Sequence, residues 1–399
     1  MKNVVILGGG YGGTKVLNKL QKSSTPMKIT IIDRHEYHCE KIDLMDVASG
    51  LISDRKICFA IEDIIDRKKT KFIQDTVEVI DHENNKVSLN KNGEISYDYL
   101  VVALGFHSET FNIPGVSENS LPMDTVTAAD NIHQHIINEM QQYKKDNDPI
   151  HLKIIVCGAG FTGVELLGSL NDMKEQYAKL AGVNKDQIVL ECVDHSSKFL
   201  PMFNTKLSDY GLKWMHSHVK FYSQCGIKEI KPHELIYTDS NNKEYSLAAG
   251  TIIWTTGVSG SNVIQKSGYP EHRGRVRVKN DLRSPIDDNV FIIGDVAAFF
   301  PDGSKRPYPT TAQIALSMGT CASKNIIKLI NNQPTIPFKY DSLGTVASLG
   351  NNKAFGMSLG VPVEGYIGSV TKKMIDDLSL YETGKVKELL SKGKFDFYH

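Results

Sequence analysis

Short runs of apolar residues alternate with amphipathic stretches over much of the chain. A run at residues 3–7 leads through a glycine-rich turn into an amphipathic stretch at 14–22, and then into a second apolar run that ends at Asp33. The same order returns later, from an apolar run at 152–157 to one at 188–194. Strand, helix and strand in this order predict βαβ units, whose strands lie parallel in one sheet. We therefore predict an α/β protein with two such sheets.

The first glycine-rich turn has the spacing of a dinucleotide-binding turn. Gly8, Gly10 and Gly13 follow the predicted strand and open the predicted helix. In such a turn the first glycine permits a sharp bend, the second lets a pyrophosphate approach the backbone, and the third lets helix and strand pack closely. The helix N-terminus adds unpaired N–H groups and a partial positive charge. Asp33 ends the next strand, where a carboxylate accepts hydrogen bonds from an adenosine ribose.

A second turn of this kind contains Gly158, Gly160 and Gly163, and the strand after it ends at Asp194. Two turns predict two dinucleotides. A nicotinamide dinucleotide and a flavin dinucleotide are the simplest pair, because the nicotinamide supplies a hydride that the flavin stores. The carboxylate of Asp194 repels the 2′-phosphate of NADPH, so we expect NADH. Glu165 is expected in the first turn of the helix, near the nicotinamide ring. The alternative is an acid that serves only the helix dipole.

Three further apolar runs end in glycine or aspartate, at residues 97–105, 250–258 and 290–297. In the last run Asp295 follows the apolar residues. Ligands of open α/β sheets bind at the carboxyl ends of the strands, so we expect Asp295 to hold a ribityl hydroxyl of a flavin.

Composition and charge narrow the class of protein. Lysine plus arginine and aspartate plus glutamate both total 46 among 399 residues, whereas a nucleic-acid-binding protein needs a basic surplus. No apolar stretch is long enough to span a membrane, and the short apolar start does not resemble a signal peptide, so we expect a cytoplasmic protein. The six cysteines lack the spacing of a metal site, so we expect free thiols and no metal.

Together these motifs resemble those of the flavoproteins that bind two dinucleotides, with Ala-Leu-Gly, Thr-Thr-Gly and late Gly-Asp segments beside the two glycine turns. The resemblance implies an α/β fold with two Rossmann-like domains, the NADH domain inserted in the FAD domain, and a small α+β C-terminal domain. The implied limits are 1–115 and 260–325 for the FAD domain, 116–259 for the NADH domain and 326–399 for the C-terminal domain.

The resemblance also implies a set of cofactor contacts. Those to FAD are Gly8, Gly9, Gly10, Tyr11, Gly12, Gly13, Asp33, Arg34, Val77, Ala103, Gly105, Asp295 and Ala312. Those to NADH are Gly158, Gly160, Gly163, Asp194 and Gly257, with Glu165 beside the reacting ring.

Residues 306–319 narrow the resemblance to one branch. They are similar to the Ala-Gln-x-Ala-x-Gln-x-Gly signature of the type II NADH:quinone oxidoreductases, with Ser317 in place of the second glutamine. In that family the glutamine at Gln313 lies beside the flavin in the quinone tunnel. Prolines and threonines before this segment predict a helix whose free N-terminus faces the flavin. Residues 36–50 and 337–354 resemble further elements of the family.

The resemblance implies a two-step reaction. A hydride passes from NADH to FAD beside Glu165, and electrons pass on to a menaquinone or ubiquinone type of quinone near Gln313. The Gln313 amide would orient a quinone carbonyl. Glu165 would relay protons if burial raises its pKa.

Because quinones dissolve in the bilayer, the resemblance implies a peripheral protein on the cytoplasmic face of the membrane. The candidate contact is segment 366–399, in which Gly384 is expected to separate two helices. One side of the first helix carries Val370, Met374, Leu378 and Tyr381. Positive charge for anionic lipid would come from Lys372, Lys373, Lys385, Lys387, Lys392 and Lys394. A helix packed on the body and a homodimer contact are the alternatives.

Three other functions compete with quinone reduction. Cys39 lies in the segment that approaches the flavin, which would suit an NADH-dependent peroxide or disulfide reductase. Cys157 and Cys321 would suit a sulfide:quinone oxidoreductase. A non-catalytic flavoprotein that senses NADH is the third alternative.

Overall fold

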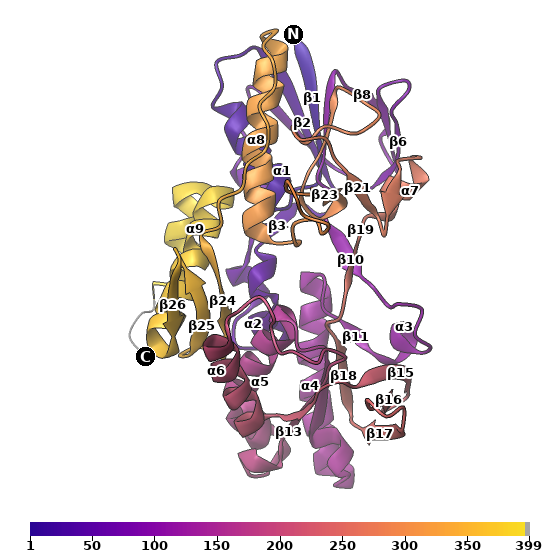
Figure 1. Cartoon of the computed structure of the whole chain (residues 1–399), viewed down its shortest axis with the longest axis vertical. Coiled ribbons are helices and arrows are strands. Elements are labelled where there is room, and N and C mark those ends of the chain that lie inside the picture. The colour runs from indigo at the N-terminus through magenta and orange to yellow at the C-terminus, as the bar shows by residue number, and fades with distance from the viewer. Residues whose placement is uncertain (396–399) are drawn as a thin grey trace.

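Two parallel sheets, one above the other in Figure 1, form the body of the molecule. The structure is a computed structural model and describes residues 1–395. The upper part is built around β1 (Lys2–Leu7) and the lower part around β12 (Lys153–Cys157). Between them β10 (Phe106–Ser108) and β19 (Val258–Gly260) pair antiparallel, so the chain passes down and back through adjacent segments.

The upper sheet has five parallel strands in the order β22-β9-β1-β2-β5. Besides β1 these are β2 (Met27–Asp33), β5 (Thr70–Gln74), β9 (Tyr99–Val102) and β22 (Val290–Ile292). Residues 4–7 of the central strand are fully buried, as expected for a parallel sheet that is covered on both faces. Helices α1 (Tyr11–Gln21) and α8 (Ala312–Ile330) pack together on one face.

The lower sheet is also parallel, in the order β11-β18-β12-β13-β14. Its other strands are β11 (Leu121–Pro122), β13 (Val189–Val193), β14 (Lys220–Tyr222) and β18 (Thr251–Trp254). It carries the two long helices α4 (Val126–Asp146) and α5 (Phe161–Ala181). α5 follows β12 and is followed by β13, which is the βαβ order predicted from the sequence.

Smaller antiparallel sheets and short helices complete the two parts. The sheets are β6 (Val77–Asp81) with β7 (Lys86–Leu89) and β8 (Gly93–Ser96), β15 (Gly226–Lys231) with β16 (Glu234–Thr238) and β17 (Glu244–Ala248), and β3 (Tyr37–Cys39) with β4 (Cys58–Ala60). β20 (Glu271–His272), β21 (Arg275–Arg277) and β23 (Ala297–Ala298) form a mixed sheet, in which β21 pairs antiparallel with β20 and parallel with β23. The remaining helices of these parts are α2 (Leu44–Ala48), α3 (Val116–Asn119), α6 (Thr205–His218) and α7 (Asn262–Lys266).

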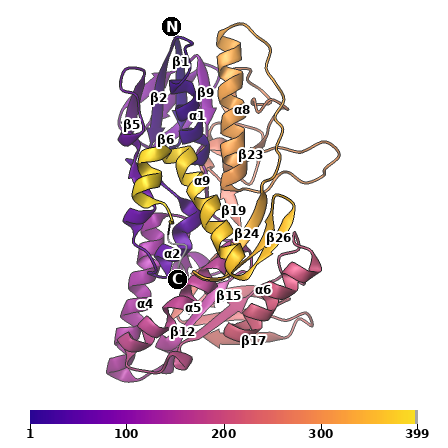
Figure 2. The same cartoon turned by 90° about the vertical axis from the view of Figure 1, so that its left-hand side faces the viewer.

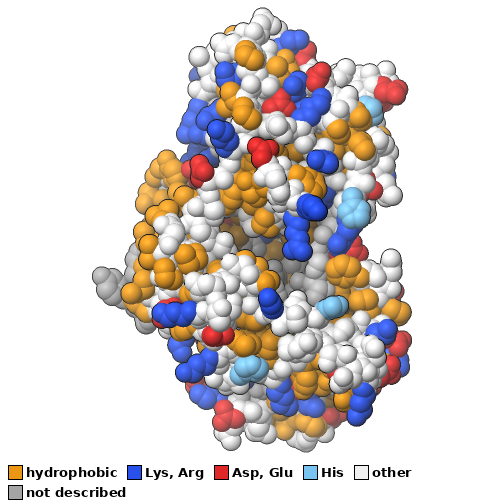
Figure 3. Space-filling model, viewed as in Figure 1, with side chains coloured by type: hydrophobic (Ala, Val, Ile, Leu, Met, Phe, Trp, Pro, Cys, Tyr) orange, Lys and Arg blue, Asp and Glu red, His pale blue; other side chains and the backbone are white. Residues whose placement is uncertain are grey.

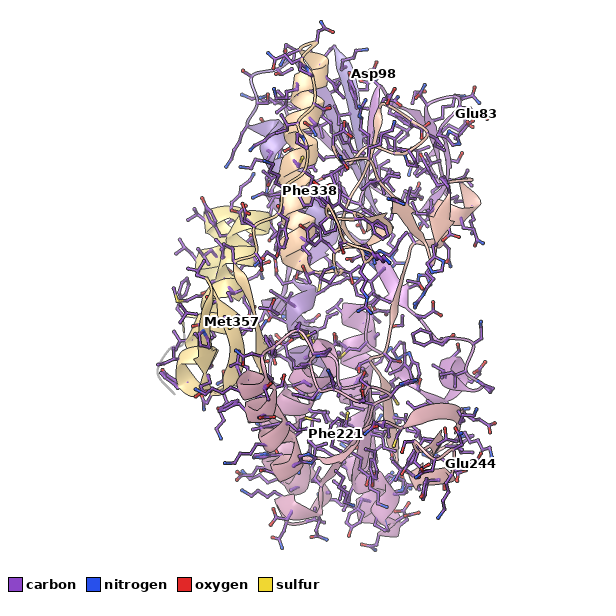
Figure 4. All side chains as sticks on the ribbon, in the orientation of Figure 1. Glu83, Asp98, Phe221, Glu244, Phe338 and Met357 are labelled. Atoms are coloured by element: carbon purple, nitrogen blue, oxygen red, sulfur yellow. The ribbon has the colours of Figure 1, made fainter. Side chains whose placement is uncertain are left out.

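The C-terminal part lies against both halves. After α8 the chain passes Phe338, labelled beside that helix in Figure 4, which packs edge-on against Phe299 with 5.1 Å between ring centroids. Strands β24 (Gly344–Ser348), β25 (Ala354–Ser358) and β26 (Val361–Glu364) then form an antiparallel sheet. α9 (Gly365–Lys392) crosses this sheet and reaches α1, as Figure 2 shows. The predicted α+β C-terminal part is thus present.

Some predicted limits need adjustment. α1 begins at Tyr11, before the predicted start at residue 14, so the turn glycines Gly12 and Gly13 belong to the helix. α8 runs through residue 325, where the implied FAD domain ends. The division into domains stays a prediction, while the antiparallel pair β10 and β19 marks where the chain passes between the parallel sheets.

α9 keeps the predicted break and exposes part of the predicted apolar side. The backbone leaves the helical conformation at Lys385, one residue after Gly384. The exposed side carries Met374, Leu378 and Tyr381, while Val370 is half-buried. Residues 396–399 of the predicted membrane segment lie outside the described residues. Within residues 1–395 the structure has no helix that is long and apolar enough to cross a bilayer.

At least five of the six lysines predicted to meet lipid bind groups of the chain itself. Lys372 contacts Asp376 at 2.7 Å, and Lys394 contacts Asp43 at 2.6 Å. The other three contact the backbone or a carboxylate: Lys385 binds the Ile64 carbonyl oxygen, Lys387 binds Asp63 and Lys392 binds the Arg55 carbonyl oxygen. The expectation fails for Lys372, whose side chain is buried against Asp376, whereas lipid contact by more exposed lysines such as Lys387 stays a prediction.

Candidate functional site

The first glycine turn is packed against backbone on two sides. Gly8 has a φ of 104°, and a Cβ there would collide with the carbonyl oxygen of Ala103. A Cβ at Gly13 would collide with the carbonyl oxygen of Gly8. At Gly10, in contrast, nothing lies within 4 Å of the position that a Cβ would take. The turn is therefore open at Gly10, where a pyrophosphate can approach the backbone.

The N-terminus of α1 can bind an anion. Its N-cap, Gly10, has no side chain to cap the helix, whereas the N-caps of α4, α6 and α8 all use their side chains in this way. The first N–H groups of α1 are therefore left without a side-chain acceptor beside the open position of the turn. These features fit the pyrophosphate of a dinucleotide.

Asp33 holds the turn from the end of β2. Its Oδ2 accepts a hydrogen bond from the Gly9 N–H at 2.6 Å, and its Oδ1 accepts one from the His35 N–H at 2.8 Å. On the other side of the turn, Nδ1 of His38 lies 2.8 Å from the Gly9 carbonyl oxygen. Asp33 retains further lone pairs for the hydroxyl groups of a ligand.

A cavity of about 440 Å³ adjoins this turn, and Figure 3 shows the face hollowed between the upper and lower parts. It brings together most of the residues assigned to FAD from the sequence. Those that line it are Gly8, Gly9, Gly10, Tyr11, Gly12, Asp33, Arg34, Val77, Ala103, Gly105 and Asp295.

Asp295 and Lys41 bring opposite charges to this cavity. Burial raises the pKa of Asp295, against the opposing effect of the cations Lys41 and Arg275. Burial lowers the pKa of Lys41, whose ammonium nitrogen lies 4.4 Å from the centroid of the Phe106 ring. Such partly dehydrated polar groups form stronger hydrogen bonds with a ligand than exposed groups do.

Two predicted FAD contacts do not line the cavity. Gly13 lies beneath the turn against Gly8, and Ala312 begins α8 one turn before Ala315, which does line the cavity. The side chain of Thr311 accepts a hydrogen bond from the N–H of Ile314 at 3.2 Å. The expectation of a free N-terminus on α8 is therefore wrong in part, because Thr311 caps one of its amides.

Sequence reasoning missed several lining residues. Tyr37 and Lys41 lie on or just after β3, and Phe106 lies on β10. The segment 36–50 did resemble a family element, but that resemblance pointed to no individual contact. These side chains reach the cavity only because β3 folds back beside the glycine turn.

The second glycine turn repeats the geometry of the first. The Oδ2 of Asp194 accepts a hydrogen bond from the Ala159 N–H at 2.8 Å, and its Oδ1 accepts one from the Ser196 N–H at 2.7 Å. A Cβ at Gly163 would collide with the carbonyl oxygen of Gly158, while nothing lies within 4 Å of a Cβ at Gly160. The N-cap of α5 again has no side-chain cap. The turn therefore fits a second dinucleotide.

The Thr-Thr-Gly segment after β18 adjoins the second turn. A Cβ at Gly158 would meet the side chain of Thr256, and Thr256 Oγ1 is buried with no hydrogen-bond partner in the structure. A Cβ at Gly257 would collide with the ring of Phe111. A buried hydroxyl without a partner is costly, which suits a place where a bound ligand supplies one.

Glu165 points away from the first cavity and toward the C-terminal part. It is the fifth residue of α5 and lies in the first turn after Gly163, as the sequence predicted. Its Oε1 accepts a hydrogen bond from the Ser348 N–H at 3.1 Å and lies 3.6 Å from Nζ of Lys372. Burial raises its pKa, while Lys372 opposes that shift.

Lys372 connects Glu165 to a buried chain of charges between α2, α5 and α9. Nζ of Lys372 lies 2.7 Å from Asp376, whose other oxygen lies 3.0 Å from Nζ of Lys394. Lys394 in turn binds Asp43 at 2.6 Å. Burial raises the pKa of Asp43 to about 7, although Lys394 opposes the shift. This chain of groups can therefore hold an exchangeable proton near neutral pH.

Gln313 is the second residue of α8 and is fixed by the segment that follows the helix. Its Oε1 accepts hydrogen bonds from the Tyr340 hydroxyl and, at 3.2 Å, from the Leu343 N–H. A backbone N–H is always a donor, so the amide orientation is determined, and the NH₂ group is the part that can donate to a ligand. This orientation suits a carbonyl ligand.

Comparison with known proteins decides the family. The sequence profile described as pyridine nucleotide-disulphide oxidoreductase matches residues 2–319. The type II NADH:quinone oxidoreductase of Staphylococcus aureus (strain NCTC 8325 / PS 47) is 36% identical over 399 residues, which cover 99% of each chain. This chain belongs to the type II NADH:quinone oxidoreductases. Membership in this family implies NAD(H) and a flavin as cofactors.

Solved structures confirm the predicted fold class. NDH2 from Plasmodium falciparum in complex with NADH superimposes with a TM-score of 0.85, at 18% identity and with full coverage of both chains. The sulfide:quinone oxidoreductase of Aquifex aeolicus gives a TM-score of 0.78 at 20% identity, covering 100% of this chain and 96% of the other. At such identities the likeness concerns the fold alone.

The cysteines that suggested sulfide chemistry lie apart in this type II family member. Cys157 is buried in a core beside the lower sheet, and Cys321 is buried on α8 in the core of the upper part. Burial raises the pKa of both thiols, that of Cys321 to about 11. The structure therefore does not bring these two sulfurs together at one site.

Proposed function

We propose that the chain is an FAD-dependent NADH:quinone oxidoreductase that does not pump protons. The supporting observation is the repeated geometry of the two glycine turns, each fixed by an aspartate and each open at one glycine. Family membership favours this function over a peroxide or disulfide reductase and over a sensor of NADH.

FAD is assigned to the turn at Gly8–Gly13 and its cavity. The amides at the start of α1 would bind the pyrophosphate, Asp33 the adenosine ribose and Asp295 a ribityl hydroxyl. When bound, a flavin accepts a hydride from a reduced nicotinamide and delivers its electrons to a quinone. The cations Lys41 and Arg275, which act on Asp295, would also attract the negatively charged reduced form.

NADH is assigned to the turn at Gly158–Gly163. Asp194 would accept hydrogen bonds from the adenosine ribose of NADH and repel the 2′-phosphate of NADPH. Both of its oxygens are already held by backbone amides, so the carboxylate is fixed in place before the ligand arrives.

Glu165 and Lys372 are assigned to proton transfer. Quinone reduction consumes protons, and a buried carboxyl with a raised pKa keeps its proton to a higher pH than an exposed one does. Lys372, Asp376 and Lys394 connect Glu165 to Asp43, so a proton can be replaced along this chain of groups. Gln313 is assigned to the quinone, to whose carbonyl its NH₂ group would donate.

We further propose a peripheral membrane protein on the cytoplasmic face. Met374, Leu378 and Tyr381 expose 60%, 46% and 43% of their surface on α9. A small cavity of about 220 Å³ beside Tyr381 is lined by Lys15 and Lys19 of α1, by Lys22 just after that helix, and by Lys385 of α9. Apolar side chains beside positive charge suit the surface of an anionic bilayer. A homodimer through the same face is the alternative, and sedimentation velocity in the presence and absence of detergent distinguishes them.

A steady-state assay tests the function. NADH or NADPH is paired with menaquinone and ubiquinone analogues, and the released flavin is identified by chromatography. We expect released FAD, oxidation of NADH in preference to NADPH, and reduction of at least one quinone. Protein that binds no flavin, or flavin that NADH reduces but no quinone reoxidises, would refute the proposal.

A further inference from the structure

Two cysteines lie directly opposite each other on neighbouring strands beside the first cavity. β3 and β4 pair antiparallel, with Cys39 opposite Cys58. Next to them, the N–H of Glu40 donates to the carbonyl oxygen of Ile57 at 2.8 Å, so this neighbouring pair is hydrogen-bonded. Hydrogen-bonded and non-hydrogen-bonded pairs alternate along antiparallel strands. Cys39 and Cys58 therefore form a non-hydrogen-bonded pair.

Side chains approach each other most closely in such pairs. The two Cα atoms of a non-hydrogen-bonded pair lie roughly 4.5 Å apart, and disulfides join Cα atoms roughly 4.4–6.8 Å apart. The Cys39 thiol hydrogen-bonds to Cys58, and this bond, together with burial, raises the pKa of Cys39. The two sulfurs therefore lie within hydrogen-bonding reach of each other, which places them for a disulfide.

The pair is also placed where a small oxidant can reach it. Cys39 and Cys58 are half-buried, and Cys39 lines the cavity of about 440 Å³. The other cysteines are fully buried within the protein, namely Cys157, Cys192, Cys225 and Cys321. The ammonium group of Lys41 acts on Cys39 and favours negative charge at the pair.

β3 connects this pair to the dinucleotide turn. His38, between Tyr37 and Cys39, lies with its Nδ1 2.8 Å from the carbonyl oxygen of Gly9. Tyr37 lines the same cavity as Cys39. The expected separation of the two Cα atoms is at the short limit for a disulfide. A disulfide would therefore shift β3 relative to β4 and change the contacts of His38 and Tyr37.

We propose that Cys39 and Cys58 are a redox-sensitive dithiol, which a hydroperoxide oxidises to a cross-strand disulfide that slows turnover at the adjoining cavity. This inference goes beyond the proposed function, since the oxidation needs neither NADH nor quinone.

The reaction balances with hydrogen peroxide as the oxidant. The thiolate of one cysteine attacks a peroxide oxygen, so that an S–O bond forms, the O–O bond breaks and hydroxide leaves. The sulfur of the other cysteine then attacks the resulting sulfenic acid, so that the S–S bond forms, the S–O bond breaks and water leaves. Two electrons pass from the sulfurs to the peroxide, and the two thiol protons end in two water molecules.

Peptide mapping of the flavin-loaded protein tests the proposal. The protein is treated with hydrogen peroxide, alkylated, digested with trypsin and analysed by mass spectrometry. We expect peptides 35–41 and 57–67 joined by a disulfide, two hydrogen masses lighter than their sum, and separated again by dithiothreitol. Cys39 or Cys58 found as sulfinic acid, or both peptides recovered alkylated, would overturn the inference.

Turnover before and after oxidation tests the functional half. Each protein is compared with its own untreated sample in the NADH:quinone assay. We expect peroxide to slow the wild-type chain and C225S by roughly twofold or more, with recovery after dithiothreitol, and to leave C39S and C58S at their untreated rates. If the disulfide forms but turnover is not slowed, the proposed effect of the disulfide on turnover is refuted. The peptide map detects the disulfide without any measurement of turnover. Absence of the disulfide can therefore be distinguished from failure of the proposed NADH:quinone activity.

Discussion

Nζ of Lys372, on α9, lies 3.6 Å from the carboxylate of Glu165, on α5. These residues are more than 200 positions apart in the sequence, and their contact joins the C-terminal part to the helix that follows the second glycine turn. Both side chains are largely buried. The charge on α9 therefore influences the protonation of an acid that belongs to the nucleotide-binding part of the molecule.

The first prediction concerns Asp43, at the other end of this chain of charges. Its pKa is raised from 3.8 to about 7, so between these values the folded protein holds a proton that the unfolded chain releases. Stability must therefore fall as pH rises through this window. D43N cannot release this proton, so its advantage over the wild type should be smaller near pH 5, where only part of the window has been crossed, than at higher pH. Near pH 8 it should be more stable by on the order of 2–4 kcal/mol.

Urea unfolding at both pH values measures this difference. D209N, an exposed aspartate on α6, serves as the matched control and should follow the wild type at both. If the free energy of unfolding depends on pH equally in D43N and the wild type, the pKa of Asp43 is not raised by folding.

The second prediction separates two roles of glycine in the first turn. A side chain at Gly10 meets open space, so G10A should fold normally but bind flavin roughly tenfold more weakly (about 1.4 kcal/mol), because its methyl group occupies the approach to the backbone. A side chain at Gly13 meets the Gly8 carbonyl, so G13A should lose about 1–3 kcal/mol of folding free energy or more. Flavin titration and thermal unfolding measure the two effects. Normal flavin affinity in G10A would place the pyrophosphate elsewhere.

The third prediction concerns the choice between NADH and NADPH. D194N removes the negative charge but keeps the size of the side chain, so the ratio of kcat/KM for NADPH to that for NADH should rise roughly tenfold. KM for NADH should rise as well, because an amide cannot accept from both the Ala159 and Ser196 amides. Initial rates with both nucleotides measure this, with D186N as an exposed control in the same part of the chain. An unchanged ratio would assign the discrimination to another residue.

The fourth prediction concerns the quinone. Q313L removes the proposed donor, so KM for the quinone should rise roughly tenfold. Reduction of bound flavin by NADH, followed by stopped flow, should keep the wild-type rate. Y340F should show a smaller rise, because the Leu343 N–H still holds the Gln313 oxygen. If Q313L slows only the reduction of flavin by NADH, Gln313 does not bind the quinone.

The fifth prediction concerns the apolar face of α9. Replacing exposed Met374 and Leu378 together by serine should weaken cosedimentation with vesicles of anionic phospholipid. I286S removes an apolar side chain of similar exposure from another part of the surface and should bind like the wild type. Raised salt should weaken binding as well, since the neighbouring cavity is lined by lysines. Binding that survives the double substitution would move the contact away from α9.

The two glycine turns could be predicted because their determinants are local. Each turn needs a strand, small residues at fixed spacing and a helix, all within one stretch of chain, and the aspartate follows on the next strand of the same βαβ unit. The structure places Asp33 and Asp194 in the same relation to their turns, with one carboxylate oxygen on a turn amide in each case. Short-range geometry leaves few alternatives for such a segment.

The contacts of Lys372 and Cys39 required the tertiary structure. The sequence placed Lys372 on a lipid-facing surface, whereas packing of α9 on α5 buries it against Asp376 and Glu165. Cys39 was recognised alone, and its partner Cys58 appears only when β3 pairs with β4 in one particular register. Local spacing along the chain thus determined where the nucleotides are expected to bind. Long-range packing decided which charges and thiols surround them, because a side chain's partners depend on which distant surfaces exclude water together.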